Sequence, residues 1–167
     1  MEKMTIGSKH RIGNLIEYAV TVSDNSAYIM LMNFVGKETI KKYGNSLGAT
    51  TTMEGKDDFG IVNATDYVIY LKKLLDLAKV YKKSEELIAY MKNTKVNKIN
   101  PSNVGNNIIA RKGGEHDVAY HDCAIIYDDE PFILCIFTQK GNIKNKDKFI
   151  NSAAKKLYKI HNKMKAS

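Results

Sequence analysis

Apolar residues in the first third of the chain recur at steps of three and four, the spacing of one face of an α-helix. The series consists of Leu15, Ile16, Ala19, Val20, Ala27, Met30, Leu31 and Phe34. A polar triplet at 23–25 interrupts the series and Gly36 ends it. We therefore predict a long helical region with a junction at the triplet, followed by a short helix over 37–43.

The middle of the chain alternates between loop-like and helical composition. Residues 44–60 are rich in Gly, Thr and Asp without apolar periodicity, which predicts a loop. Asn63 to Asp66 has the composition of a helix start, and an apolar face follows it through Leu77. Another short helix is predicted from Ser84 to Lys92, with Ser84 capping its first turn.

The pattern changes after a polar connection over 93–106. The segments 107–111, 118–127 and 132–138 are rich in Ile, Val, Tyr and Phe, and a tight-turn composition at 128–131 joins the last two. We predict three strands, the last two forming a hairpin. An amphipathic helix then runs from Phe149 to Met164 and needs an apolar sheet face to cover.

This order of elements predicts an α+β fold. A helical region over about 1–100 is followed by antiparallel sheet strands and a C-terminal covering helix over about 107–167. We find no internal repeat and no linker that marks a second independent domain, so we expect a single domain over 1–167. A chain of 167 residues with 44% hydrophobic content is long enough for one core.

Charge and targeting signals narrow the possible functions. Only two of the 26 basic residues are arginines, and the lysines spread over several segments, so we expect no nucleic-acid partner. A net charge of +8 leaves weak attraction to anionic polymers as an alternative. No stretch approaches the roughly 20 apolar residues of a membrane span, and the first ten residues lack a signal peptide's apolar core.

Two cysteines, Cys123 and Cys135, fall in neighbouring predicted strands. A bridge between them is conceivable, but the sequence alone does not establish it. We expect two buried free thiols. We identify no pattern typical of a metal site or a cofactor site.

Two short motifs carry a resemblance to a known family. The triplet Ser23-Asp24-Asn25 lies in an apolar helical context, and Lys112-Gly113-Gly114 follows about 90 residues later in a strand-like context. In order, spacing and flanking sequence they resemble the S-D-N and K-T-G signatures of class A β-lactamase-like, penicillin-recognising serine hydrolases. The resemblance extends over nearly the whole chain and implies the C-terminal portion of that fold.

The resemblance implies a role for each matching position. Ser23 would relay a proton to the departing ring nitrogen of a β-lactam, and Asn25 would contact the acyl side chain of the substrate. Lys112 would hold the substrate carboxylate and polarise Ser23, beside Gly113 and Gly114. The backbone N–H of Glu115 would be an oxyanion donor. Asp24 would be structural.

Three departures from the family pattern bear on activity. The family's nucleophile lies in an S-x-x-K motif upstream of S-D-N, and the 22 residues before Ser23 contain none. The one match, Ser152 to Lys155, lies in the predicted C-terminal helix, where we expect no catalytic role. Gly113 replaces the family's Thr or Ser and lacks its hydroxyl. Glu54 is the only glutamate in the segment that corresponds to the family's deacylation loop, and we expect it to be a solvated loop residue.

We therefore expect a β-lactamase-like serine hydrolase fragment that is inactive alone. The complete form would react with β-lactams or cell-wall peptides through an acyl-serine ester. Two alternatives stay open: a non-catalytic relative that binds β-lactam or peptidoglycan peptides, and a basic polyanion-binding protein. The site of action of this chain is not evident, although the resemblance implies a secreted or cell-surface parent.

The resemblance also implies further strands beside the segment 132–138 that this chain lacks. The run Ile133 to Phe137 is apolar and of high β-propensity, and an unpaired edge of this kind invites another chain. We expect a homo-oligomer or strand exchange through this edge, or its coverage by a missing N-terminal fragment.

Overall fold

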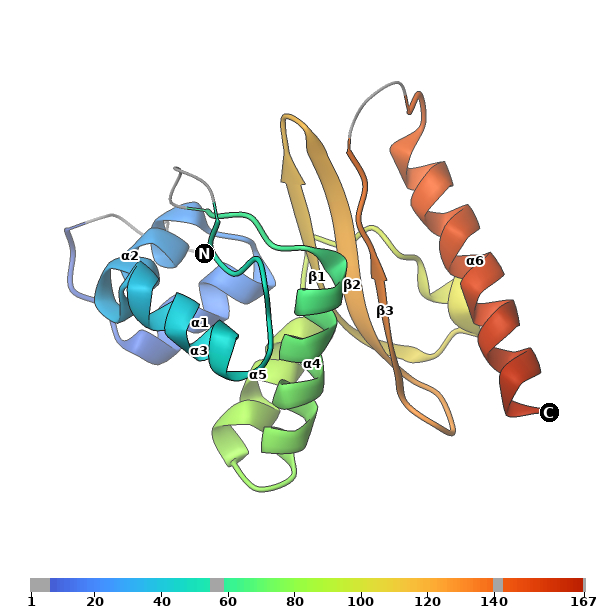
Figure 1. Ribbon diagram of the computed structural model, residues 1–167, viewed down its shortest axis with the longest axis horizontal. Helices are drawn as coiled ribbons and strands as arrows, with labels where there is room; N and C mark the ends of the chain where they lie inside the picture. The colour runs from blue at the N-terminus through green and yellow to red at the C-terminus, as the bar shows by residue number, and fades with distance from the viewer. Residues whose placement is uncertain (1–6, 55–58, 140–142, 167) are drawn as a thin grey trace. The chain divides into compact units, whose positions relative to one another are not determined.

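The computed structural model describes residues 7–54, 59–139 and 143–166 (Figure 1). The chain divides into two compact units, Met1–Lys95 and Val96–Ser167. The first unit is helical, and the second combines a sheet with a helix. This is the predicted α+β order of elements, which is confirmed. The expectation of a single domain stays a prediction.

Five α-helices lie in the described part of the first unit. They are α1 (Ile12–Thr21), α2 (Asn25–Val35), α3 (Lys37–Ser46), α4 (Ala64–Ala78) and α5 (Lys82–Lys92). Helix α1 packs against α2 and α5, and α4 packs against α5. A small buried cluster around Leu15 and Ala27 joins α1 to α2, with Tyr18 and Met30 packed against it. The predicted junction at 23–25 is the break between these two helices.

Helix α3 continues past the predicted end at Tyr43. The loop was expected to begin at Gly44, yet this residue lies inside the helix and is buried. A Cβ at Gly44 would collide with the hydroxyl groups of Thr52 and Tyr70, which are hydrogen-bonded to each other. The glycine is therefore present for close packing and does not end the helix.

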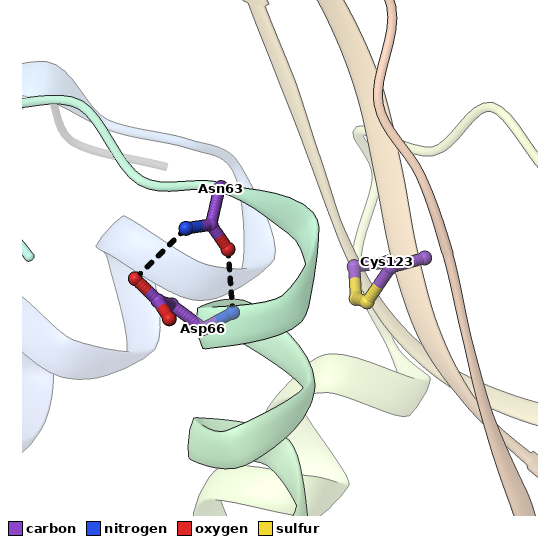
Figure 2. The surroundings of a disulfide bond; sticks show 4 residues. Asn63, Asp66 and Cys123 are labelled. Atoms are coloured by element: carbon purple, nitrogen blue, oxygen red, sulfur yellow. Dashed lines mark hydrogen bonds between the residues drawn. A yellow bond between two sulfur atoms is a disulfide. The ribbon is translucent and has the colours of Figure 1, made fainter. Parts of the chain in front are cut away.

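Asp66 holds the segment after α3 against the start of α4. Its carboxylate accepts hydrogen bonds from the backbone N–H groups of Thr50 (2.9 Å) and Thr51 (2.7 Å) and from the Thr51 hydroxyl. Asn63 caps α4 by accepting from the Asp66 N–H, and its amide donates back to the Asp66 carboxylate (Figure 2). Burial raises the pKa of Asp66, but the hydrogen bonds from Thr51 and Thr50 outweigh it and lower the pKa below its usual value.

The expected cap at Ser84 is wrong. Helix α5 begins at Lys82, two residues earlier, with Tyr81 at the N-cap and no side-chain cap. The Ser84 backbone N–H donates to the Tyr81 carbonyl at 2.9 Å, which places Ser84 within the first turn. Ser84 is therefore already inside the helix. The N–H groups that follow it have partners within the helix, so its hydroxyl cannot cap them.

The second unit is a three-stranded antiparallel sheet with one long helix across a face (Figure 1). Its elements are the 3-10 helix η1 (Pro101–Val104), strands β1 (Ile108–His116), β2 (Ala119–Tyr127) and β3 (Phe132–Ile136), and helix α6 (Lys146–Lys165). The strand order is β1-β2-β3. The core lies between the sheet and α6 and includes Ile99, Val104, Ile109, Ala124, Ile126, Leu134, Ile136, Ile150 and Ala154.

Two strand boundaries differ from the predicted ones. Strand β1 was expected to end at Arg111 but continues to His116, and β2 follows it after only two residues. Residues 112–116 have low β-propensity, so the pairing with β2 across this segment sets their conformation. Strand β3 ends at Ile136, two residues before the predicted end.

The expectation of two free thiols is also wrong. Cys123 of β2 and Cys135 of β3 are directly opposite each other in the antiparallel register. The structure joins them in a disulfide (Figure 2). The pairing of β2 with β3 places the two cysteines close enough for a bridge, which the sequence alone did not establish.

Reducing this disulfide should lower the stability of the second unit. The bridge closes a loop with a sequence separation of 12, and loop-closure entropy predicts a loss of about 2–3 kcal/mol in the free energy of unfolding. Urea unfolding with and without dithiothreitol measures the difference. The Cys123→Ser/Cys135→Ser variant should unfold at the same urea concentration under both conditions, whereas equal midpoints for the wild type would contradict the prediction.

Among the described residues, no helix is both long and apolar enough to cross a bilayer.

Candidate functional site

Ser23 lies in the tight turn between α1 and α2. Its φ angle is +56°, in the left-handed region that a non-glycine residue rarely adopts. The backbone N–H groups of Val22 and Asp24 both donate to the Tyr18 carbonyl at 3.2 Å and close the end of α1 around this residue. A strained residue held by its surroundings is the kind of position at which functional side chains are found.

The residues after Ser23 begin helix α2. Asp24 is the N-cap, and its carboxylate accepts from the Ala27 N–H at 2.8 Å. This is the structural role expected for Asp24. Asn25 is the first helical residue and its side chain is exposed, so its amide is accessible to a ligand.

The end of α1 is also held by contacts from the last residues of the first unit. The Lys95 N–H donates to the Thr21 carbonyl at 2.7 Å, and the Thr94 hydroxyl donates to the Val20 carbonyl at 3.2 Å. Thr94 is buried. The turn that carries Ser23 is therefore fixed by contacts on both sides of it.

Lys112 lies in the middle of β1, on the face of the sheet that also carries its register partner Cys123. Its side chain is partly buried, and Nζ donates to the Gly113 carbonyl at 2.6 Å. Burial lowers the pKa of Lys112, the Asp122 carboxylate opposes this effect, and the charge of Lys98 adds to it. A partly desolvated cation of this kind interacts more strongly with an anion than a fully solvated lysine does.

The two glycines after Lys112 are in different environments. A Cβ at Gly113 would lie 3.1 Å from the Val96 carbonyl oxygen, tighter than ordinary packing. A Cβ at Gly114 would have no atom within 4 Å. Gly113, which lacks the family's hydroxyl, thus lies close to the backbone at 96–97. The surface over Gly114 is open.

Glu115 ends this group and is tied to the loop before η1. Its carboxylate lies 3.0 Å from Lys98 Nζ, and the Lys98 ammonium lies 4.2 Å from the centre of the Tyr120 ring. Burial lowers the pKa of Lys98, but the contacts with Glu115 and Tyr120 outweigh it, and the pKa is raised. These contacts hold the end of β1 at the position where the Glu115 N–H was expected to act.

Sequence reasoning gave no role to His121, which lies opposite Gly114 in the register of β1 and β2. It therefore shares a face of the sheet with Lys112, two residues along β1. His121 Nδ1 accepts from the Thr138 N–H at 3.0 Å, and its ring stacks on Phe137 at 4.3 Å. With Nδ1 accepting, Nε2 carries the proton of the neutral ring. Only strand register could have revealed this position.

Asp122 braces the loop before η1 from the opposite face of the sheet. It is fully buried, and Oδ2 accepts from the backbone N–H groups of Lys98 and Ile99, both at 2.8 Å. Burial raises the pKa of Asp122, although these N–H groups and the charge of Arg111 act in the other direction. Arg111 donates to the Ile99 carbonyl and so holds the same loop.

The two remaining candidates lie where the sequence predicted. Ser152 and Lys155 are both exposed residues of α6, in the second unit. Glu54 is exposed in the first unit and forms a weak ion pair with Lys41 at 3.7 Å. Neither arrangement provides a buried base next to a nucleophile.

The candidate residues fall into two groups, one in each unit. Ser23 and Asn25 are brought together by the α1–α2 turn of the first unit. Lys112, Gly113, Gly114 and Glu115 are consecutive in β1 of the second unit, next to His121. The second group offers a cation, an imidazole and an open backbone segment on one strand pair, which are the kinds of group that interact with anions.

Comparison with known proteins gives a family and a fold. The model of the beta-lactamase enzyme family matches residues 1–161. No curated protein matches the chain by sequence. Among solved structures, PBP-A is similar with a TM-score of 0.80 and 18% identity, over 96% of this chain and 64% of that chain.

Two further solved structures have the same fold. A mutant of PBP-A, described as an acyl-enzyme complex with penicillin G, is similar with a TM-score of 0.79 and 17% identity. The similarity covers 96% of this chain and 65% of that chain. The chromosome-encoded β-lactamase of Vibrio parahaemolyticus has a TM-score of 0.76 and 22% identity, over 93% of this chain and 66% of that chain. The chain therefore spans less than two thirds of the length of these structures.

Proposed function

The chain belongs to the beta-lactamase enzyme family, and from this we propose that it is the substrate-holding part of a β-lactamase-like serine hydrolase. The complete form would react with β-lactams or with the peptide stems of cell wall. The observation that supports this most strongly is the group on β1 and β2. There a partly buried Lys112 lies on the same sheet face as the open position at Gly114 and the imidazole of His121.

The proposed chemistry is acyl transfer through a serine ester. The nucleophilic serine would add to the lactam carbonyl carbon, the carbon–nitrogen bond of the ring would break, and the ring nitrogen would take up a proton. We assign the relay of that proton to Ser23, whose hydroxyl is placed by the strained turn. Water would then hydrolyse the ester and restore the serine.

Lys112 is assigned to the carboxylate that β-lactams carry. A charged hydrogen bond to a partly desolvated ammonium contributes about 1.5–3 kcal/mol. Gly113 offers no hydroxyl, and we assign the second donor to His121 Nε2 on the neighbouring strand. Asn25 would contact the acyl side chain of the substrate, and the Glu115 N–H would stabilise the oxyanion.

These 167 residues contain no nucleophile in the required context, because no S-x-x-K motif precedes Ser23 and the one in α6 is solvent-exposed. Incubation with benzylpenicillin should therefore leave the intact mass of the purified chain unchanged. Ligand-detected NMR of the same sample should show reversible binding. A known penicillin-acylated enzyme in a parallel reaction serves as the control for the reagent.

Two results would contradict this proposal in different ways. A stoichiometric covalent adduct would place a nucleophile within the chain and direct peptide mapping to Ser23 and Ser152 first. An unchanged mass together with no ligand binding would contradict the proposal that the β1–β2 group binds substrate.

A non-catalytic binding protein is the second candidate, and the packing at Gly113 favours it. A family-type Thr at this position would press its Cβ against the Val96 carbonyl oxygen. A side chain at this position would therefore require the Val96 carbonyl to move by a few tenths of an ångström. Reversible binding by a longer version of the protein, without turnover or adduct, would support this candidate over the hydrolase.

A further inference from the structure

Two aromatic rings of the first unit form a stacked pair to which the proposed chemistry gives no role. Tyr28 of α2 and Phe59 lie with their ring centroids 5.3 Å apart and an interplanar angle of 9°. Tyr28 is partly buried, whereas Phe59 is 45% exposed. Aromatic side chains gathered at one open place are a usual lining of ligand sites. We call these two residues the Tyr28–Phe59 pair.

The backbone next to Phe59 is closely held. Glu54 and Ile61 form an antiparallel bridge, in which the Ile61 N–H donates to the Glu54 carbonyl at 2.6 Å. Gly60 has a φ of +63°, and a Cβ at this position would lie 2.8 Å from the Cα of Met53. Only glycine suits this backbone conformation together with this close approach. The segment that carries the Phe59 ring is therefore fixed at Gly60 and Ile61.

The hydroxyl of Tyr28 joins α2 to the same segment. It donates to the Phe59 carbonyl at 3.4 Å and lies 3.9 Å from the sulfur of Met53. These contacts fix the end of the Tyr28 ring, while the ring face lies against Phe59. Both rings are thus in place before a ligand arrives, which lowers the entropy cost of binding one.

The Tyr28–Phe59 pair lies close to Asn25, which we assign to the acyl side chain of the substrate. Asn25 is exposed and precedes Tyr28 by three residues in α2. Residues at this spacing are neighbours on one side of a helix, with about 5–6 Å between their Cβ atoms. If Asn25 contacts the amide of an acyl side chain, the group beyond that amide comes within reach of the two rings.

We propose that the Tyr28–Phe59 pair is a specificity subsite that selects substrates whose acyl side chain ends in an aromatic ring. The inference rests on the proposed function and adds the class of substrate to it. A ring placed against the pair gains stacked or edge-to-face contacts as well as apolar burial. An anionic side chain is less favourable, because it loses hydration and meets the electron-rich faces of the two rings.

A purely structural role is the alternative for the same contact. The pair would then only hold residues 59–61 on α2, and removal of the Phe59 ring would weaken the binding of all ligands by the same factor. A subsite predicts instead that the loss depends on the side chain of the ligand. Comparison of two ligands on one variant therefore separates the two roles.

Benzylpenicillin and its methyl analogue, in which an acetyl group replaces the phenylacetyl group, are matched probes. They share the bicyclic nucleus, the carboxylate and the side-chain amide, and differ only in the ring. NMR titration should show that benzylpenicillin binds about 10-fold more tightly to the wild type. This factor corresponds to about 1.4 kcal/mol, the upper range for one aromatic contact.

Variants at Phe59 test the assignment directly. Phe59→Ala should lower the affinity for benzylpenicillin about 10-fold, to that of the methyl analogue, whereas Phe59→Trp should keep the preference for the ring. Phe59→Lys should favour α-carboxybenzylpenicillin over benzylpenicillin, a gain of binding that misfolding cannot produce. Phe149→Ala in α6 is the matched control, because Phe149 is 47% exposed, and it should leave both affinities unchanged.

The results that would overturn the subsite differ from those that would overturn the proposed function. If neither penicillin binds to the wild type, both are wrong. If both penicillins bind equally well, or if Phe59→Ala keeps the preference for the ring, the subsite is wrong and the proposed function stands. An equal loss for both ligands in Phe59→Ala would assign the Tyr28–Phe59 pair to structure alone.

Discussion

Replacing Asp122 with alanine is expected to lower the free energy of unfolding by about 3–5 kcal/mol, the range for breaking a buried charged contact. The carboxylate is fully buried and accepts hydrogen bonds from the backbone N–H groups of Lys98 and Ile99. Alanine would leave both donors without a partner in the core and would remove the negative charge near Arg111. Urea unfolding followed by far-UV circular dichroism measures the loss.

Two further variants serve as controls for this loss. Asp122→Asn keeps an oxygen that accepts from the loop N–H groups and removes a buried charge. It should therefore lower the free energy of unfolding much less than alanine does. Asp117→Ala, in the exposed turn between β1 and β2, should change stability by less than about 0.5 kcal/mol. A similar loss for Asp117→Ala, or none for Asp122→Ala, would contradict the bracing role.

The pH dependence follows from the direction of the Asp122 pKa shift. Burial is the largest effect and raises the pKa in the folded state above the unfolded value. A raised pKa means that the folded state binds the proton more tightly, so this group stabilises more as the pH falls through the folded pKa. The wild type should therefore gain stability relative to Asp122→Asn as the pH is lowered from neutrality. A constant difference would show that the shift is absent.

Lys112→Met is expected to weaken the binding of benzylpenicillin to this chain by about 10- to 100-fold, the equivalent of one lost charged hydrogen bond. Methionine keeps the length of the apolar stem, so the sheet face should stay packed. The measurement is an NMR titration with the ligand. Lys155→Met on the exposed side of α6 is the matched control and should leave the affinity unchanged.

Burial lowers the pKa of Lys112, which adds a pH signature to the same experiment. The ammonium is charged below its pKa, so binding should hold at neutral pH and fall as the pH rises through a value below that of an ordinary lysine. In Lys112→Met this alkaline loss should disappear. Persistence of the loss in the variant would assign it to another group.

The elements that sequence reasoning predicted well are those whose pattern is local. The apolar periodicity of α1, α2, α4 and α6 and the β-branched runs of β2 and β3 are properties of neighbouring residues, so composition and spacing identify them. The break at 23–25 was predictable because Asp24 caps the next helix through a contact only three residues away.

The misplaced boundaries depend on distant contacts. Gly44 has the composition of a loop, but packing against Thr52 and Tyr70 keeps it helical. Residues 112–116 are poor β-formers that β2 holds in the strand. For Ser84, composition alone could not show that the helix had already begun two residues earlier.

The candidate site follows the same division between local and distant information. The sequence alone determined the family, the α+β order of elements and the two motifs, because residue identity and spacing along the chain carry that information. Only the tertiary structure decided the partner of Cys123, the strained conformation of Ser23, the crowding at Gly113 and the position of His121 opposite Gly114. Each of these depends on residues that the fold brings together from separate parts of the chain or on a backbone shape set by surrounding contacts, and chemical identity in one short segment does not encode them.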